Sequence, residues 1–214
     1  TKNVVFVGNN VQARALAALP GKNVLFAFAL SAGHREADRV VSIDLKKITI
    51  GQLPDATSNK QLIGRIFYGT KYKVVYEPNM EDYLLCHAAF VMPAAFACYK
   101  TDGDLKKLRG DTAYLNRLLD ANIEGYRAIR NAGHAILPKE DADFEGEKYR
   151  KTCLRFFKLM CATSLGKLCA SDHAMNAIDE MNALNRDLKK FFDANGAAYP
   201  VWQALEAEAG RYLQ

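Results

Sequence analysis

The pattern of apolar residues changes near residue 80, and this change constrains the fold more than any other feature of the sequence. Up to Pro78, short β-branched or apolar segments alternate with Gly, Pro, Asn and Asp, as is typical of strands joined by turns. After Pro78, apolar residues recur at three- and four-residue spacing over long stretches, which predicts helices. We therefore expect an α/β part over residues 1–80 and an all-helical part over residues 81–214.

The first part is predicted to hold four strands and two helices. The strands are expected at residues 4–7, 23–30, 39–53 and 72–76, and the helices at residues 11–19 and 58–68. A strand, a helix and a second strand in this order favour a βαβ unit of a parallel sheet. The second part is predicted to hold five helices, at residues 81–99, 112–131, 145–168, 172–194 and 200–213. Gly133 and Gly196 are expected to end two of these helices, and Pro200 to begin the last one.

The segment VVFVGNN at residues 4–10 is a β-branched run that ends in Gly8, as the first strand of a nucleotide-binding sheet does. The dinucleotide fingerprint Gly-x-Gly-x-x-Gly needs its second glycine for the approach of the pyrophosphate and its third for a close helix. Here the turn continues as GNNVQA, and nowhere among the 14 glycines do two stand two residues apart. The segment therefore predicts the end of a strand, but not a dinucleotide turn.

Composition and charge are those of an ordinary soluble globular chain that can bury a core. The net charge of +5 comes from basic residues scattered among acidic ones, so a nucleic-acid surface is weakly supported. Five cysteines without a Cys-x-x-Cys pair argue against a disulfide framework or a zinc site and for a reducing compartment, and three of them, Cys153, Cys161 and Cys169, are expected in a helix core. We see no leader or apolar run of 18 residues, so neither secretion nor membrane insertion is indicated.

Motifs for hydrolytic or metal chemistry are missing from the sequence. It contains no His-Glu-x-x-His and no Gly-x-Ser-x-Gly, and its four histidines do not cluster with carboxylates at ligand spacing. The stretch GRIFYGTK has the glycine spacing of a phosphate loop, but its Lys and Thr are transposed and it follows no strand. We interpret that stretch as a chance match.

The predicted helix at residues 172–194 carries one apolar stripe, so it is expected to pack on a core along its whole length. Beside the stripe, Asn176 and Glu180 are four residues apart and share a helical face, with Asp172 one turn earlier. An amide and a carboxylate there could bind a hydroxyl or keto group at a domain cleft. The alternative is that they are solvated helix residues, which is the commoner case for Glu.

The predicted helix at residues 81–99 is apolar on nearly all sides, which indicates a buried central helix. Pro93 is expected to kink it. His87 is the one titratable side chain within the apolar run, and we interpret it as a satisfied core histidine rather than a catalytic one.

Several segments together resemble the ketopantoate reductase (2-dehydropantoate 2-reductase) family over essentially the whole chain. They are VVFVGNNVQARALAALPGKNVLFAFALSAG, ITIGQL, YLLCHAAFVMPAAFACY and DEMNALNRDLKKFFDANGAAYP. The resemblance implies an α/β + α protein: a partial Rossmann NADP-binding domain at residues 1–80, then a helical substrate and dimerisation domain of the 6-phosphogluconate-dehydrogenase type at residues 81–214. Because the family's glycine turn belongs to a first strand that is not in this sequence, we expect the chain to be the later two-thirds of a reductase.

The resemblance also assigns candidate site residues. Asn9 or Asn10 matches the family's asparagine that faces nicotinamide and substrate, and Glu180 matches its active-site glutamate. Asn176, beside Glu180, is the candidate substrate-binding residue, and no metal ligand is implied.

One departure concerns the family's general acid, a lysine near the start of the long buried helix. Leu84 or Leu85 stands at that position, and leucine cannot transfer a proton. Apolar residues also replace the two substrate-binding asparagines that follow the lysine. They are Ala88 or Ala89, and Met92.

Two functions from different classes follow from these observations. The first is a cytoplasmic NADP-dependent oxidoreductase of pantothenate biosynthesis or a related reaction, acting on a small 2-keto acid or related carbonyl compound, with this chain alone inactive. The second is a non-catalytic relative whose helical domain is a binding or dimerisation module. The sequence leaves the oligomeric state open, although exposed apolar surface at a truncated sheet would favour self-association, with a homodimer as one option. Neither function predicts a nucleic-acid or membrane partner.

Overall fold

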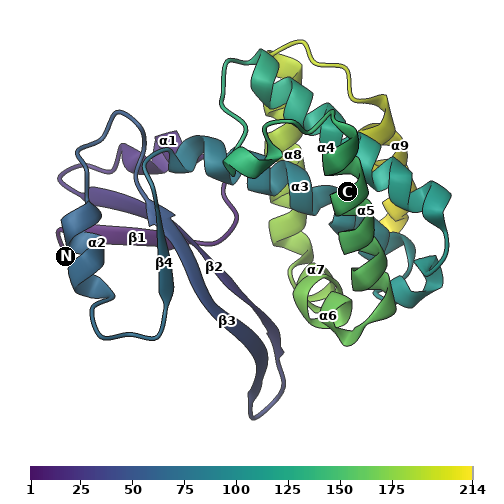
Figure 1. Cartoon of the computed structure of the whole chain (residues 1–214), viewed down its shortest axis with the longest axis horizontal. Helices are drawn as coiled ribbons and strands as arrows, with labels where there is room; N and C mark the ends of the chain where they lie inside the picture. Colours follow the sequence, from purple (N-terminus) through teal and green to yellow (C-terminus); the bar gives the residue numbers. More distant parts are fainter. Residues whose placement is uncertain (214) are drawn as a thin grey trace.

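The computed structural model describes residues 1–213 and shows a small sheet followed by a bundle of helices (Figure 1). The sheet part contains β1 (Asn3–Val7), α1 (Ala13–Ala17), β2 (Asn23–Arg35), β3 (Val40–Gly51), α2 (Lys60–Ile66) and β4 (Lys73–Glu77). The α-helices of the bundle are α3 (Met80–Lys100), α4 (Thr112–Asn131), α5 (Glu147–Ala162), α6 (Ser164–Gly166), α7 (Asp172–Asn176), α8 (Ile178–Ala194) and α9 (Pro200–Ala209). The shorter turns are η1 (Leu105–Leu108), η2 (Lys139–Asp141), the π-helical η3 (Lys167–Ser171) and η4 (Gly210–Tyr212).

The four strands form one mixed sheet in the order β1-β2-β3-β4. β1 pairs with β2 in parallel through α1, which confirms the predicted βαβ unit, and β3 pairs with β4 in parallel through α2. β2 and β3 are antiparallel because a short turn joins them directly. The sheet thus has a Rossmann-like start but is not parallel throughout.

β2 and β3 continue beyond the sheet as a two-stranded arm (Figure 1). The expected strand at residues 23–30 is therefore too short, because its pairing with β3 continues past a bulge at Ala29/Ser31 as far as Arg35 and Val40. Gly33 lies inside this pairing, and a Cβ there would lie 2.2 Å from the Val41 carbonyl oxygen. The close approach of the two strands explains a glycine in a strand interior.

The two faces of the sheet have separate cores because successive side chains of a strand point to opposite faces. Phe26 packs with Ala13 of α1 and with Met80 and Leu84 of α3 on one face. Its neighbours Leu25 and Ala27 pack on the other face, which α2 covers. The first turns of α3 therefore pack on the sheet, while the rest of this helix packs in the bundle.

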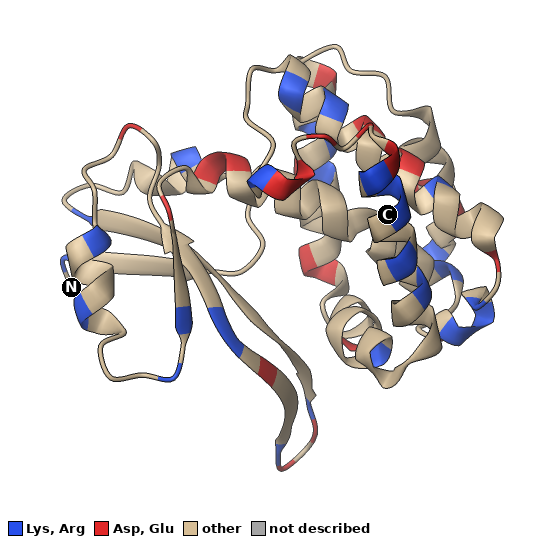
Figure 2. Cartoon of the chain, viewed as in Figure 1, with Lys and Arg blue, Asp and Glu red and all other residues tan. Residues whose placement is uncertain are grey.

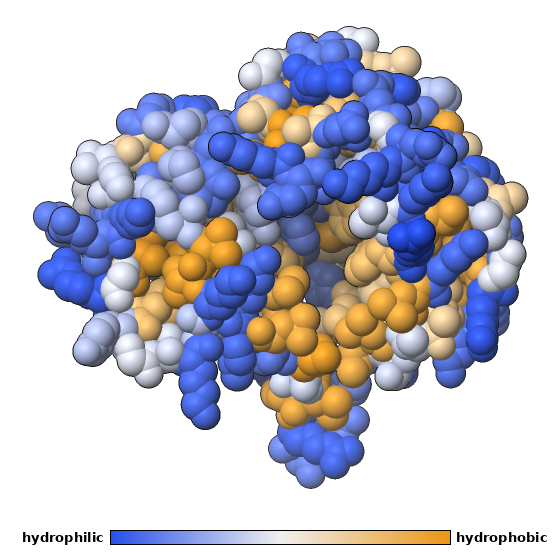
Figure 3. All heavy atoms as spheres, in the orientation of Figure 1, coloured by the Kyte–Doolittle hydropathy of each residue, from blue (hydrophilic) through white to orange (hydrophobic). Residues whose placement is uncertain are grey.

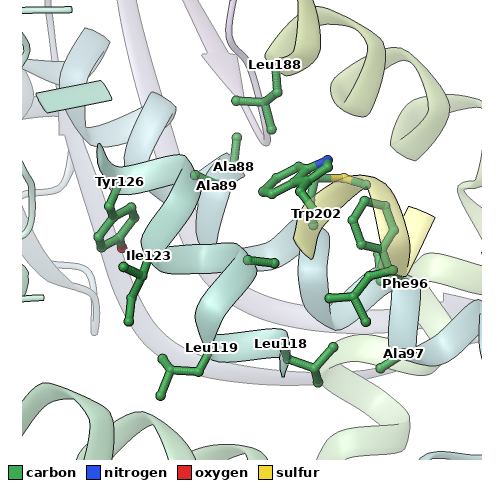
Figure 4. Close-up of a cluster of buried hydrophobic side chains, with 14 of the residues drawn as sticks. Ala88, Ala89, Phe96, Ala97, Leu118, Leu119, Ile123, Tyr126, Leu188 and Trp202 are labelled. Carbon is green, nitrogen blue, oxygen red and sulfur yellow. The ribbon is translucent and has the colours of Figure 1, made fainter. Parts of the chain in front are cut away.

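The helical bundle has one large core around α3 (Figure 4). Trp202 of α9 is fully buried there, edge-on to Phe96 and Phe192, whose ring centroids lie 5.4 and 5.3 Å away. α3 is long and apolar enough to cross a membrane by length and composition, but 72% of its most apolar window is buried inside this fold. The predicted central helix is confirmed, and it runs through Pro93 without interruption.

The remaining helices agree with the predictions in part. α4 spans the predicted residues 112–131, and Gly133 and Gly196 follow their helices with φ of 88° and 63°, a conformation that glycine tolerates. The predicted helix at residues 145–168 begins at Glu147 and is interrupted at Thr163, after which helical turns resume as α6 and η3. The chain turns so tightly here that a Cβ at Gly166 would lie 1.9 Å from the Met160 carbonyl oxygen. The predicted helix at residues 172–194 is interrupted at Ala177, whose φ and ψ are −123° and 42°.

The cysteines of the described chain carry no disulfide. Cys153 and Cys161 are buried in the helical core, as predicted, and burial raises the pKa of both thiols. Cys169 is half-buried, in the π-helical turn. Basic residues recur along α5 but are elsewhere interspersed with acidic ones (Figure 2).

Candidate functional site

The structure brings two of the four predicted site residues together. Asn9 Nδ2 donates a hydrogen bond of 3.2 Å to Glu180 Oε1, across 171 positions of the sequence. Asn9 is the second residue after β1, and Glu180 lies in the first turn of α8. The bond therefore joins the end of the first strand to the helical bundle.

The local backbone explains how Asn9 leaves the sheet. Gly8 has φ of 127°, a conformation that suits glycine alone, and its amide donates to the Ala27 carbonyl at 3.0 Å, the last bond of β1 with β2. Asn10 Oδ1 then accepts from the Gln12 amide at 2.6 Å, a local turn that leads into α1. The side chain of Asn10 is thus used within its own loop.

A second bond holds the same loop on the bundle. Gln12 Nε2 donates to Asp187 Oδ2 of α8 at 2.5 Å. Nothing in the sequence signals this pair, because the two residues are 175 positions apart and each is an ordinary surface residue. We call the region where the β1–α1 loop and β2 meet α3, α7 and α8 the junction.

Asn176 lies elsewhere in the site region. It is exposed at the end of α7, and its Nδ2 donates to the Asp172 carbonyl at 2.6 Å within the same helix. Because the helix is interrupted at Ala177, Asn176 and Glu180 belong to different helices, and the prediction that they share one helical face is wrong. Glu180 instead lies near His173, with Nε2 3.7 Å from Oε1.

His87 of α3 faces the sheet. Its ring centroid is 3.9 Å from that of Phe28 on β2, and its ring is parallel to that of Tyr83 at 6.3 Å. Nε2 is buried and has no hydrogen-bond partner in the described chain, so the prediction of a satisfied core histidine is wrong. Burial lowers the pKa of His87 to about 4, so the imidazole is neutral at neutral pH.

Buried polar atoms without a hydrogen-bond partner gather at the junction. Five of the six such side-chain atoms found in residues 1–213 lie there, and Tyr114 Oη is the exception. The five are Asn9 Oδ1, His34 Nδ1, His87 Nε2, Asp172 Oδ2 and His173 Nε2. His34 Nδ1 and Asp172 Oδ2 approach to 2.9 Å without the alignment of a hydrogen bond. His173 Nε2 lies 3.7 Å from Glu180 Oε1, so Asn9 Oδ1 and His87 Nε2 are the two atoms of the five for which no facing charged group is found in residues 1–213. An unsatisfied buried group costs about 1–3 kcal/mol, so these two atoms indicate a place where a ligand could bind.

The space-filling view agrees with this placement, since the surface is hollowed between the sheet part and the bundle (Figure 3). A second hollow, of about 280 Å³, lies between α8 and the C-terminal end of the chain. Its Lys189 is paired with Glu206 and its Lys190 lies 3.5 Å from Asp187. Within residues 1–213, no group of three or more His, Cys, Asp or Glu side chains could hold a metal ion.

The α3 positions to which the resemblance assigns the lysine and the asparagines hold buried apolar side chains. All are at most 4% exposed and pack in the apolar cores: Leu84, Leu85, Ala88, Ala89 and Met92. A lysine at either leucine would be enclosed among apolar side chains. Among the polar side chains that α3 presents to the sheet part, His87 packs against Phe28 of β2.

Comparison with solved structures decides the fold. A dimeric ketopantoate reductase from Staphylococcus aureus matches 99% of this chain and 77% of its own length, with a TM-score of 0.68 and 10% identity. The 2-dehydropantoate 2-reductase from Geobacter metallireducens matches 97% and 67%, with a TM-score of 0.74 and 15% identity. The chain has the ketopantoate reductase fold.

A third structure with this fold, a PanE/ApbA family ketopantoate reductase from Ralstonia eutropha, matches 99% of this chain and 67% of its own length, with a TM-score of 0.69 and 18% identity. No family model and no curated protein matches the sequence. The fold recognised from the sequence is therefore confirmed, at identities that show the fold alone. The chain spans about two thirds to three quarters of the length of these ketopantoate reductases.

Proposed function

We propose that this chain belongs to a cytoplasmic NADP-dependent oxidoreductase that acts on a small 2-keto acid or a related carbonyl compound. The observation that carries the proposal is the Asn9–Glu180 bond, which places an amide and a carboxylate from two distant segments at one point of the junction. In an α/β sheet, ligands bind outside the carboxyl ends of the strands, and Asn9 stands at that end of β1.

The two side chains suit a hydroxyl or keto group. The Glu180 carboxylate can accept a hydrogen bond from a substrate hydroxyl, and it lies in the first turn of α8, where the helix dipole favours its negative charge. Asn9 Oδ1 is buried without a partner and can accept from a second donor. Binding of a substrate would then compete with the 3.2 Å bond that the two residues make with each other.

Part of an NADP site fits these residues. The free Asn9 Oδ1 at the end of β1 is suited to an amide donor such as the nicotinamide carboxamide. When bound, NADPH would supply the hydride for reduction of the carbonyl. The glycine turn that holds the pyrophosphate is not among the 214 residues, so we expect these residues alone to bind NADPH weakly.

The second candidate is a non-catalytic binding or dimerisation module. It is favoured by the apolar burial of Leu84 and Leu85, where the resemblance assigns the proton donor. The dimeric state of the Staphylococcus aureus enzyme supports the proposal of a homodimer for this chain. The two candidates differ in whether Glu180 is needed for turnover.

The test is an NADPH-consumption assay with ketopantoate and pyruvate, on the longest protein that the reading frame of this chain encodes. Glu180→Gln keeps the size of the side chain and removes its charge, and we expect it to lower kcat/KM at least about a hundredfold. Glu147→Gln, at an 80% exposed side chain of α5, is the matched control and should change nothing. Turnover that is unaffected by Glu180→Gln would contradict the proposed site, and no turnover with any carbonyl compound would favour the binding module.

A further inference from the structure

We propose that His87 is a ligand-binding residue of the junction, whose imidazole hydrogen-bonds the carbonyl oxygen of the substrate through Nε2. This inference rests on the proposed function. It assigns a role to a residue that stands outside the Asn9–Glu180 pair.

The first step is position. β1 and β2 run in parallel with Val7 opposite Ala27, so the chain leaves the sheet at Gly8 and Asn9 just past the level of Ala27, close to Phe28 on β2. The His87 ring packs against Phe28 with the two rings tilted by 49°. α3 also packs on α7 and α8, which carry His173 and Glu180. His87 therefore lies on a helix that contacts β2 through the Phe28 ring and that also packs on α7 and α8.

The second step is the unsatisfied atom. A side chain that only filled space between Phe28 and Tyr83 would be more stable as an apolar residue, because burying an unpaired ring nitrogen is unfavourable. His134 shows the alternative in the same protein, since its Nδ1 lies 2.6 Å from Asp82 Oδ1. His87 has no such partner among residues 1–213, and a ligand atom would supply one.

The third step is chemistry. An imidazole that burial keeps neutral has one ring N–H, and it can donate this hydrogen to a carbonyl oxygen and polarise it without adding a charge to the site. The other polar groups of the junction are the amide of Asn9, two carboxylates and two further histidines. A ring N–H of His87 is suited to an oxygen that gains negative charge during reduction.

The experiment compares the free energy of unfolding and ligand binding of wild type, His87→Leu and His134→Leu. His87→Leu removes an unpaired group, so its Tm should rise by about 2–4 °C. His134→Leu leaves Asp82 without that partner, so its Tm should fall by a similar amount. Binding of pyruvate and of its uncharged methyl ester is followed by NMR of labelled histidines. In the wild type, each probe should shift the His87 ring signals. In His87→Leu, the affinity for each probe should be about tenfold or more lower.

Each other outcome has a defined meaning. A Tm that falls in His87→Leu as in His134→Leu overturns the inference, because His87 is then a packing residue. Equal binding of the probes by wild type and His87→Leu also overturns it, while the proposed function stands. Binding of neither probe by the wild type, together with no NADPH turnover, overturns both.

Discussion

The helical core and the junction differ in how their buried polar groups are hydrogen-bonded. In the core, Asn122 Nδ2 bonds the Ala89 carbonyl and its Oδ1 accepts from Tyr149 Oη at 2.6 Å, and Asn185 Oδ1 accepts from Trp202 Nε1 at 2.9 Å. At the junction, five buried polar atoms lack a hydrogen-bond partner within residues 1–213. The difference shows that the bundle is built for stability and that the junction keeps unsatisfied groups, as ligand sites do.

The largest effect is expected where the core is densest. Trp202→Ala should lower the free energy of unfolding by about 3–5 kcal/mol, because it leaves a cavity between Phe96 and Phe192 and removes the bond to Asn185. Urea unfolding of both proteins measures this value. A loss below about 1 kcal/mol would contradict the description of this region as a packed core.

A smaller effect is expected from a polar group of the same core. Asn122→Leu should cost about 1–3 kcal/mol, because the hydroxyl of buried Tyr149 is left without its acceptor. The double variant Asn122→Leu/Tyr149→Phe removes both partners and should recover part of the loss in the same urea titrations. If the double variant is less stable than the single variant by the full cost of a second mutation, the two side chains do not act as a pair.

The junction should show its own dependence of stability on pH. The pKa of His87 is about 4 in the folded protein and about 6.5 in the unfolded chain, so the unfolded state binds more protons between these values. The contribution of His87 to the free energy of unfolding is therefore fully present above about pH 6.5 and is lost as the pH falls toward 4. The loss is about 1 kcal/mol between about pH 7.5 and 5.5.

The comparison is between wild type and His87→Leu over the same pH series, so that the contributions of all other groups cancel. The free energy of unfolding of His87→Leu should fall less over this pH range, because the variant has no imidazole at this position. Identical pH profiles for the two proteins would show that His87 is not a buried neutral imidazole.

The smallest effect on stability is expected at the Asn9–Glu180 bond. The Glu180 side chain is 46% exposed, so Glu180→Gln should change the free energy of unfolding by less than about 0.5 kcal/mol while it lowers turnover. Chemical denaturation and the NADPH assay on one sample separate the two effects. A variant that lost stability and turnover together would place Glu180 in the scaffold rather than in the site.

The sequence predicts what depends on local pattern. Periodicity locates α4 over residues 112–131 and the burial of α3, and the two glycine caps follow from the need for positive φ. The β2 half of the arm is missed because Ser31 and Gly33 have low strand propensity and become a strand through their pairing with β3.

The candidate site is predictable only in part. Asn9 and Glu180 are found through family resemblance, but their contact depends on packing across 171 positions. The interruption at Ala177, which places Glu180 in the first turn of a new helix, has no Gly or Pro to mark it. His87 stands out in the sequence as the one titratable residue of an apolar run, but its unpaired Nε2 is a property of the folded protein alone.

The central claim is that the junction binds a small carbonyl ligand, and the most direct measurement is an NMR titration of the protein with methyl pyruvate. We predict that the shifted signals will concentrate at the side-chain amide of Asn9, the His87 ring and the backbone around Glu180. Shifts that instead concentrate around Asn182 and Lys189, in the hollow between α8 and the C-terminal end of the chain, or that appear nowhere up to the solubility limit of the ester, would contradict the account.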